Sequence, residues 1–356
     1  MSTSEPSKEI EALRRAMSIT RMVDYGMSRD QAERAHRDVV TAPSWDVCLE
    51  AIADEAIQHA RTADTSGQRE VAAEHWRKAA ASLVFAQMAF NFDGDRKRAL
   101  YRRMTDCFAE HVKRTQFSIE KIGAPYRGGR LFGWLCRAPG QSAAPTVIVF
   151  GGMSGWATAY LSMAEALCNA GLSCMLVDGP GQGESRLEGG VFLSAEVAVA
   201  FSSFVDLAIE ASGGKPTGIW GNSFGGLFAA LTTIADARIS ACCINGAPPR
   251  CEVPPFRTAT EQMSAMFGRS SLDDVADVMG ALSFDGARSP LVVPTLVVEG
   301  GADPLVPLGT QAAFREGNNH PSSGTLTWPD GEHTIYNHGS ERNVLVSRWF
   351  AETFSL

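Results

Sequence analysis

Residues 217–227 read T-G-I-W-G-N-S-F-G-G-L, and they place a polar serine between two apolar segments. The run 218–220 has the character of a buried strand, whereas 225–235 has that of a helix. A serine on the sharp turn between a strand and a helix takes an unfavourable backbone conformation, and flanking glycines avoid clashes there. The pattern predicts that Ser223 is a nucleophile on a strained turn. The alternative is a serine at a helix N-terminus with no chemical role.

A serine hydroxyl needs a general base near neutral pH, and the base needs a group that fixes its tautomer. A carboxylate and then a histidine are expected at the ends of later strands, in that chain order. Asp303 follows the apolar run 295–298, and His333 follows the run 325–328. We therefore predict that Ser223, Asp303 and His333 form a catalytic triad.

Other residues compete for the two partner roles. Glu299 is nearer to its strand than Asp303, but it is expected to point aside or to line the site. His320 and His338 are expected in solvent-exposed loops. The remaining histidines fall on predicted helices, where packing and surface roles are expected: His36, His59, His75 and His111.

Attack on a carbonyl creates an oxyanion, which requires backbone N–H donors that are already in position. The N–H of Phe224, directly after the nucleophile, is the first predicted donor. The second should follow the first central parallel strand, where the sequence reads F-G-G-M at 150–153. Met153 is the predicted donor and Gly152 the alternative. The same glycines also fit a simple turn between a strand and a helix.

The chain changes its periodicity near residue 115. Before that point, helical spacing predicts helices at 9–20, 29–40, 46–59, 69–89 and 95–113. After it, helical intervals separate short apolar runs, which predict strands at 117–122, 130–137, 146–150, 173–177, 217–220, 239–244, 295–298 and 325–328. Runs that are apolar throughout suit a parallel sheet covered by helices on both faces. We predict a helical domain at 1–115 and an α/β domain at 116–356.

The composition, with 45% hydrophobic and 20% charged residues, is that of a soluble globular protein. The N-terminus lacks a basic segment followed by an apolar core, and no apolar run is long enough to span a bilayer, so a cytoplasmic protein without membrane contact is predicted. A formal charge of −8 argues against nucleic-acid binding. The basic cluster at 96–103 is expected to be a solvated helix face rather than an anion site. The eight scattered cysteines are expected to be buried thiols, so no metal or other cofactor is implied.

Five motifs together resemble the α/β-hydrolase superfamily. They are G-N-S-F-G at 221–225, F-G-G-M at 150–153, D-G-P-G-Q-G-E-S at 178–185, G-A-D-P-L-V-P at 301–307 and G-E-H at 331–333. The resemblance covers almost all of residues 116–356 and implies a mostly parallel eight-stranded sheet flanked by helices. The family usually has histidine where Gly151 stands. The departure has little effect on the oxyanion assignment, because the backbone of that position matters more than its side chain.

The helical first third, joined to D-G-P-G-Q-G-E, is similar to the branch that contains FrsA-like proteins, fungal polyketide-shortening hydrolases and 2,6-dihydroxypseudooxynicotine hydrolase. This resemblance implies that the helical domain covers the active site, that the protein is a homodimer, and that the reaction hydrolyses carbon–carbon bonds next to ketones. It also implies an extra acidic residue on the loop after the strand that follows the Ser223 turn, which is called the nucleophile elbow. Glu252 is the nearest match, and a salt-bridged surface glutamate is the alternative. The Met-rich stretch within 248–290 is expected to form a cap insertion with adaptable apolar contacts.

Three functions follow from these observations. The first is a serine hydrolase that cleaves a small aromatic or polyketide-like ketone at a carbon–carbon bond next to a carbonyl. The second is a carboxylesterase or acyltransferase with the same triad. The third is a hydrolase-like regulatory protein that binds a ligand, which an intact set of three catalytic residues disfavours.

Overall fold

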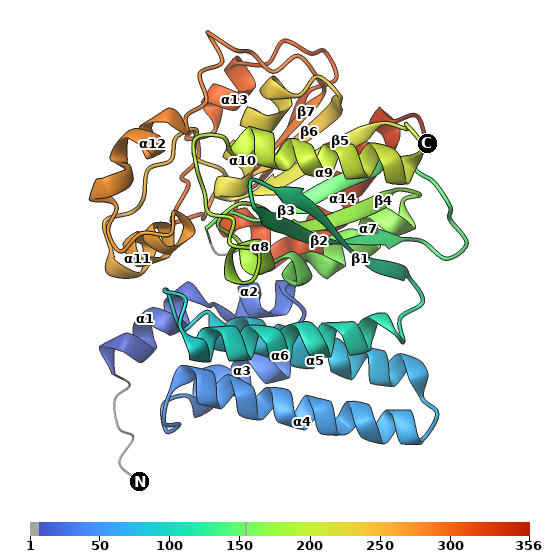
Figure 1. The fold of residues 1–356 in the computed structure, drawn as a ribbon, viewed down its shortest axis with the longest axis vertical. Helices are drawn as coiled ribbons and strands as arrows, with labels where there is room; N and C mark the ends of the chain where they lie inside the picture. The colour runs from blue at the N-terminus through green and yellow to red at the C-terminus, as the bar shows by residue number, and fades with distance from the viewer. Residues whose placement is uncertain (1–6, 154) are drawn as a thin grey trace. The chain divides into compact units, whose positions relative to one another are not determined.

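The computed structural model describes residues 7–153 and 155–356, and the chain divides into two compact units, 1–116 and 117–356 (Figure 1). Residues 1–6, on which the expectation about the N-terminus partly falls, lie outside the described residues. The boundary between the units falls where the sequence changes from helical to β-rich periodicity.

Helices make up the described part of unit 1. They are α1 (Lys8–Ala16), α2 (Ile19–Asp24), α3 (Arg29–Asp38), α4 (Trp45–Thr65), α5 (Arg69–Gln87) and α6 (Asp95–Val112). α5 packs against both α4 and α6, and residues 79–87 are buried on all sides because small alanines let the neighbouring helices approach. The single helix expected at 9–20 is instead two helices, since Ser18 begins a new one by accepting a hydrogen bond from the N–H of Arg21 at 3.3 Å.

The basic cluster of α6 is only partly the solvated face that the sequence suggested, since Arg96 and Arg102 are exposed but several of its cations have protein partners. Arg96 and Arg103 both donate to the carboxylate of Glu50 on α4, at 2.6 Å and 2.7 Å. Lys97 is buried, and its ammonium donates to the carbonyl of Phe90 at 2.7 Å. Helical spacing alone did not reveal that α4 supplies acidic partners for these cations.

An eight-stranded sheet forms the centre of the described part of unit 2, in the order β1-β2-β4-β3-β5-β6-β7-β8. Its strands are β1 (Ser118–Tyr126), β2 (Gly129–Arg137), β3 (Thr146–Phe150), β4 (Ser173–Asp178), β5 (Thr217–Asn222), β6 (Ile239–Asn245), β7 (Thr295–Gly300) and β8 (Gly324–Trp328). β2 pairs antiparallel with β1 and β4, and all other pairs are parallel. The predicted mostly parallel eight-stranded sheet is confirmed.

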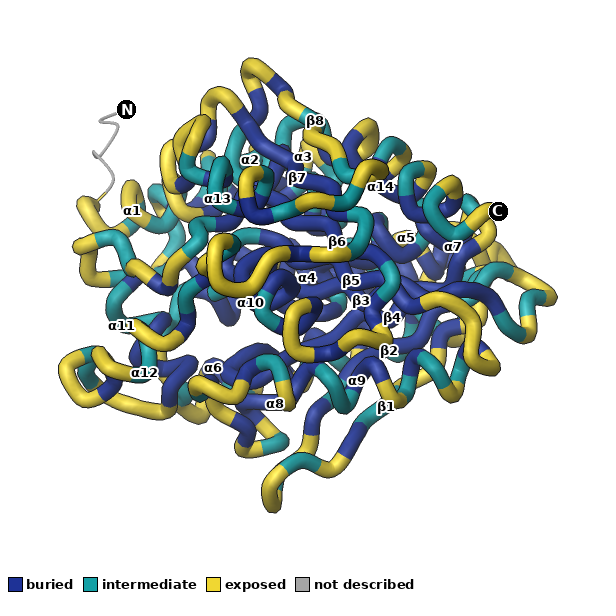
Figure 2. The backbone as a smooth tube through the Cα atoms, turned by 90° about the horizontal axis from the view of Figure 1, so that it is seen from above, coloured by how far each residue is buried: buried dark blue, intermediate teal, exposed yellow. Residues whose placement is uncertain are grey.

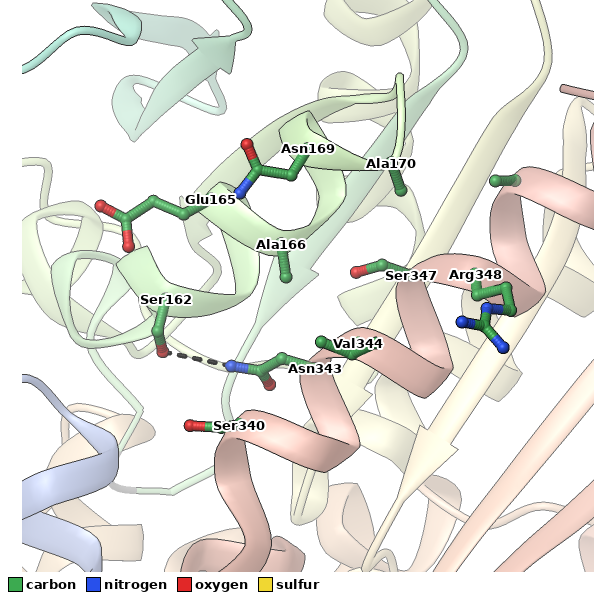
Figure 3. Close-up of a pocket in the computed structure, with 11 residues that line it drawn as sticks. Ser162, Glu165, Ala166, Asn169, Ala170, Ser340, Asn343, Val344, Ser347 and Arg348 are labelled. Atoms are coloured by element: carbon green, nitrogen blue, oxygen red, sulfur yellow. Dashed lines mark hydrogen bonds between the residues drawn. The ribbon is translucent and has the colours of Figure 1, made fainter.

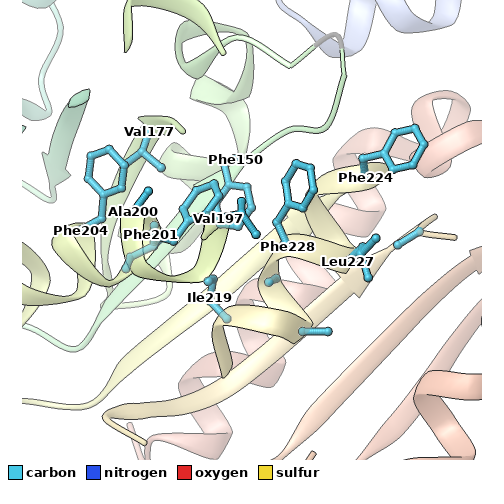
Figure 4. Close-up of a cluster of buried hydrophobic side chains, with 14 of the residues drawn as sticks. Phe150, Val177, Val197, Ala200, Phe201, Phe204, Ile219, Phe224, Leu227 and Phe228 are labelled. Atoms are coloured by element: carbon cyan, nitrogen blue, oxygen red, sulfur yellow. The ribbon is translucent and has the colours of Figure 1, made fainter. Parts of the chain in front are cut away.

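Helices cover both faces of the sheet, and the central strands are buried (Figure 2). α9 (Val197–Ser212) packs with α10 (Phe224–Ala235), and α7 (Leu161–Asn169) packs with α14 (Gly339–Thr353). Adjacent residues of β5 point to opposite faces: Ile219 belongs to the cluster with α9 and α10, whereas Trp220 lies 6.5 Å from Phe350 of α14 between ring centroids. Phe150 stacks on Phe201 at 4.0 Å within the first cluster (Figure 4). Burial of the strands on both faces explains their unbroken apolar runs.

Shorter elements lie in the connections. They are η1 (Ala157–Tyr160), α8 (Gly183–Leu187), α11 (Arg257–Met266), η2 (Asp273–Val275), α12 (Ala276–Ala281), α13 (Ala312–Glu316) and η3 (His333–His338). The stretch 248–290, expected as a cap, contains α11, η2 and α12 between β6 and β7. All eight cysteines are buried and free, which confirms the expected thiols.

In the ranges 7–153 and 155–356, no helix is both long and apolar enough to cross a bilayer.

Candidate active site

The residues predicted to act together all follow parallel strands. Ser223 comes directly after β5, Asp303 follows β7, and His333 follows β8. Because the strands are parallel, their carboxyl ends meet at one edge of the sheet, which is where ligands bind in folds of this class.

Ser223 occupies a strained turn. Its backbone has φ 59° and ψ −135°, a conformation that L-residues rarely adopt and that costs about 1–3 kcal/mol. The N–H of Ser223 donates to the carbonyl of Asn245 at 2.8 Å, which holds the turn against β6. A Cβ atom at Gly221 would overlap the carbonyl of Gly225, so the turn tolerates only glycine there.

The three predicted side chains are within hydrogen-bonding distance in the expected order. Nε2 of His333 lies 2.9 Å from Oγ of Ser223, and Nδ1 of His333 lies 2.8 Å from Oδ2 of Asp303. The other carboxylate oxygen of Asp303 accepts from the N–H groups of Leu305 and Val306, at 2.8 Å and 2.9 Å. Since a carboxylate only accepts, Nδ1 of His333 carries the proton and Nε2 is free to accept the proton of the serine hydroxyl.

The competing residues have other partners. Glu299 is paired with Arg315 at 2.7 Å, so its carboxylate is occupied away from His333. His320 accepts from the N–H of Ser322, and His338 lies 3.0 Å from Asp330. Both of these histidines are half-buried rather than exposed.

The backbone after His333 is unusual because two consecutive residues have left-handed conformations. Thr334 has φ 50° and Ile335 has φ 64°, which is costly for β-branched side chains. The carbonyl of Thr334 accepts from Nδ2 of Asn245 at 3.1 Å and from Nη1 of Arg342 at 2.6 Å. These two buried side chains therefore hold the strained loop that carries the imidazole.

Asn245 and Arg342 are the supporting residues that the sequence did not reveal. Asn245 also donates to Oδ1 of Asn222 at 2.8 Å, which links the histidine loop to the residue before Ser223. The signal available in the sequence was a polar residue at the end of each of two apolar strands, Asn222 and Asn245. The complete burial of Arg342 on α14 is visible only in the structure.

The predicted oxyanion donors lie on two glycine-rich segments that touch. A Cβ atom at Gly152 would lie only 2.5 Å from the backbone nitrogen of Phe224, so this close approach requires glycine. A Cβ atom at Gly151 would overlap the hydroxyl of Tyr160. Tyr160 therefore fills the space of the missing side chain, which accounts for glycine where the family usually has histidine.

Glu252 lies in the loop after β6, and its side chain is exposed. Its N–H donates to the carbonyl of Arg250 at 2.9 Å. Burial raises the pKa of the neighbouring Cys251 thiol to about 12, so this cysteine stays a thiol and does not compete as a nucleophile.

A separate cavity of about 550 Å³ lies between α7 and α14 (Figure 3). Its lining includes Ser162, Glu165, Asn343 and Arg348, and Nδ2 of Asn343 donates to Oγ of Ser162 at 3.3 Å. Neither Ser223, Asp303 nor His333 lines it, so it is not the site described above.

The serine aminopeptidase S33 family model matches residues 141–271, a stretch that contains Ser223. The chain is 24% identical over 314 residues to 2,6-dihydropseudooxynicotine hydrolase of Paenarthrobacter nicotinovorans, which covers 84% of this chain and 81% of that protein.

Solved structures share the fold. A crystal structure of 2,6-dihydroxy-pseudo-oxynicotine hydrolase matches with a TM-score of 0.81 and 22% identity, over 94% of this chain and 95% of that one. Wild-type AbyA5 matches with a TM-score of 0.71 and 16% identity, over 97% and 98% of the two chains. The Pyrococcus furiosus esterase Pf2001 matches with a TM-score of 0.52 and 17% identity, over 68% and 92%.

The sheet order, the elbow between β5 and α10 and these similarities agree with the resemblance seen in the motifs. The chain is an α/β-hydrolase enzyme, similar along most of its length to 2,6-dihydropseudooxynicotine hydrolase.

Proposed function

We propose that this enzyme is a serine hydrolase that cleaves a small aromatic or polyketide-like ketone at a carbon–carbon bond next to a carbonyl. Ser223 is the nucleophile, His333 the general base and acid, and Asp303 the group that orients His333. The observation that carries the proposal is the continuous pair of hydrogen bonds from Asp303 through His333 to Ser223. A hydrolase that lacked nucleophilic catalysis would not need this order of contacts on a strained turn.

The first half of the reaction forms an acyl-enzyme. Oγ of Ser223 attacks the substrate carbonyl carbon while its proton passes to Nε2 of His333. The carbonyl oxygen becomes an oxyanion, and the N–H groups of Phe224 and Met153 donate to it. When the intermediate collapses, the bond from the carbonyl carbon to the leaving group breaks, and His333 gives its proton to that group.

The second half returns the enzyme to its starting state. His333 takes a proton from water, the hydroxide attacks the acyl carbon, and Oγ of Ser223 leaves with the proton from His333. The products are a carboxylic acid and the protonated leaving group. For carbon–carbon cleavage the leaving group is an enolate or a similar stabilised carbanion, which must be protonated at carbon. Glu252 is a second candidate for that acid, because its exposed side chain lies in the loop after β6, the strand that pairs with β5.

The preference for a ketone is supported by similarity over nearly the whole chain. The matched hydrolase is named for its action on an oxynicotine, and the alignment includes the helical unit as well as the sheet. The branch that the sequence resembles hydrolyses carbon–carbon bonds next to ketones. Ester hydrolysis is the second candidate, because the same triad suffices for it and because 68% of the chain also matches the structure of an esterase.

A fluorophosphonate probe followed by peptide mapping tests the nucleophile. Wild-type enzyme is expected to carry one adduct, on the peptide that contains Ser223, since the probe reacts with serines activated by a base. An adduct on another residue, or no adduct, would remove the triad from the mechanism. Mass spectrometry of both products from aryl β-diketones and from simple aryl esters then separates the two proposed reactions.

Replacing Gly152 with alanine is expected to lower the turnover number by about 10²–10³-fold, the scale for losing an oxyanion donor. The new methyl group would lie 2.5 Å from the nitrogen of Phe224 and would force the two segments apart. Steady-state kinetics on an aryl ester and the thermal unfolding midpoint check this result.

Gly280→Ala is the matched control, because a Cβ atom there meets nothing within 4 Å. This variant is expected to keep wild-type turnover. Full activity in the Gly152→Ala variant would show that the segment 151–153 does not form the oxyanion site.

A further inference from the structure

The side chain of Gln182 lies against the glycine segment that follows β3. It is only 3% exposed, and it belongs to the D-G-P-G-Q-G-E-S motif after β4, to which the mechanism assigns no role. Its Nε2 donates to the carbonyl of Gly151 at 2.5 Å and to the carbonyl of Gly152 at 2.9 Å. Its Oε1 accepts from the N–H of Gly179 at 2.8 Å.

These partners fix the orientation of the amide. A glutamine amide offers two N–H donors on one side and one acceptor oxygen on the other. Two carbonyls lie on the donor side and one N–H lies on the acceptor side, so each partner has the required complement. The backbone N–H of Gln182 also donates to the carbonyl of Gly179 at 3.0 Å, which leaves the residue little freedom to move.

The carbonyl of Gly152 and the N–H of Met153 belong to one peptide unit. A peptide unit is planar and trans, so its carbonyl and its N–H point in opposite directions. When Gln182 holds the carbonyl of Gly152, it also sets the direction of the N–H of Met153, away from Gln182. The same reasoning links the carbonyl of Gly151 to the N–H of Gly152, which is the alternative donor.

The far end of this segment is held by the same motif. Oδ1 of Asp178 accepts from the N–H of Ala157 at 2.9 Å, and Oδ2 accepts from the N–H of Glu184 at 2.9 Å. A Cβ atom at Gly183 would overlap the carboxylate of Asp178, so the turn can close over that side chain only with glycine. The motif therefore fixes the glycine segment at its beginning through Gln182 and after its end through Asp178.

We propose that Gln182 is a positioning residue for the oxyanion site: by holding the carbonyls of Gly151 and Gly152 it aims the N–H of Met153 at the developing negative charge. The proposal rests on the serine hydrolase function proposed above. A hydrogen bond to a carbonyl also polarises its peptide unit, which makes the N–H of that unit a stronger donor. Gln182 acts on the transition state through the backbone and does not itself touch the substrate.

Gln182→Glu is the informative substitution, because it changes the donor and preserves the shape. An ionised glutamate still accepts from Gly179 but presents an oxygen to two carbonyl oxygens, whereas a protonated one donates again. Burial raises the pKa of a carboxylic acid, so the buried glutamate is expected to become protonated in mildly acidic buffers.

The measurement is the second-order rate constant for fluorophosphonate labelling of Ser223 in the full chain, between pH 6 and pH 8.5. The probe's phosphoryl oxygen tests the same donors, and no natural substrate is required. At the alkaline end we expect Gln182→Glu to react about 10- to 100-fold more slowly than wild type, less than the complete loss of an oxyanion donor. The ratio of the variant's rate to the wild-type rate should rise as the pH falls, because the protonated glutamate donates again. Dividing the two rates cancels the titration of groups that both proteins share.

Gln311→Glu is the matched control. Gln311 is equally buried, accepts from the N–H of Ala247 at 2.9 Å and donates to the carbonyl of Val298 at 2.9 Å. The Gln311→Glu variant is expected to show how a buried glutamate affects stability in general. Its labelling rate is expected to stay near the wild-type rate at every pH. Gln182→Met has no donor, so it is expected to react as slowly as Gln182→Glu at high pH and to show no recovery at low pH. This variant tests the proposal if Gln182→Glu does not fold.

Two results would overturn the proposal. One is a labelling rate within about twofold of wild type for a folded Gln182→Met variant, since a factor of two is under 0.5 kcal/mol. The other is a deficit in Gln182→Glu that is the same at every pH, which would indicate a purely structural role. Failure of the serine hydrolase proposal looks different, because wild-type enzyme would then carry no adduct on Ser223.

Discussion

Replacing Ser223 with alanine is expected to lower the turnover number by about 10⁶-fold, the scale seen when a serine nucleophile is removed from a complete triad. The substitution deletes the only atom that forms the covalent bond to the substrate and leaves His333 with no proton to accept. Alanine has the same Cβ atom as serine, so it tolerates φ 59° no worse, and the fold should survive. Steady-state kinetics, the thermal unfolding midpoint and loss of the fluorophosphonate adduct check these three expectations.

Ser347→Ala is the matched control for this prediction. Ser347 lies on α14, is 1% exposed, and its hydroxyl has no hydrogen-bond partner among the described residues. Removing an unsatisfied buried hydroxyl is expected to leave turnover unchanged and stability unchanged or slightly higher. Ester or ketone hydrolysis that persists at wild-type rate in Ser223→Ala would exclude this serine as the nucleophile.

The elbow could be predicted from the sequence because its constraints are local. Gly221 is in close contact with Gly225, and Gly225 is in close contact with Gly151 of the facing segment. Each of these contacts requires a glycine, and the glycines are visible in the sequence. The sheet was predictable for a related reason: strands buried on both faces are apolar at every position, so β3, β4 and β5 stand out as short runs. The chain order of the polar residues beyond the later runs at 295–298 and 325–328 then indicated Asp303 and His333.

The residues that hold the site in place were not predictable, because they bind backbone carbonyls, most of which are distant in the sequence. Asn245 and Arg342 meet at the carbonyl of Thr334 from 89 and 8 positions away. Gln182 reaches back 30 and 31 positions to two backbone carbonyls, which have no sequence signature at all. A side chain that recognises backbone atoms becomes visible only when the fold brings the two segments together.

Helix boundaries show a different limit. The spacing of apolar residues continued through 9–20, but Ser18 accepts a hydrogen bond from the N–H of Arg21 and thereby starts a new helix. An N-cap serine has extended backbone angles, which ends the helix before it. Periodicity measures which face is buried, whereas capping decides where a helix stops, and the two signals disagreed here.

Replacing His333 with alanine is expected to lower turnover by about 10⁶-fold as well, because removing the base from such a triad costs as much as removing the nucleophile. Without an acceptor 2.9 Å from Oγ, Ser223 keeps its proton and attacks poorly. The carboxylate of Asp303, whose other oxygen is held by two N–H groups, would remain in place with nothing to orient. Turnover and the rate of fluorophosphonate labelling measure the loss.

The double variant Ser223→Ala with His333→Ala separates a triad from two independent contributions. If the two residues act as one unit, the double variant should be no slower than either single variant, with a residual rate about 10³–10⁴-fold above the uncatalysed reaction that comes from the oxyanion site and substrate binding. Independent contributions would instead multiply to a far lower rate. His338→Ala is the control, because that imidazole is paired with Asp330 and lies outside the chain of contacts. A loss in His338→Ala as large as that in His333→Ala would mean that the imidazole beside Ser223 is not the base.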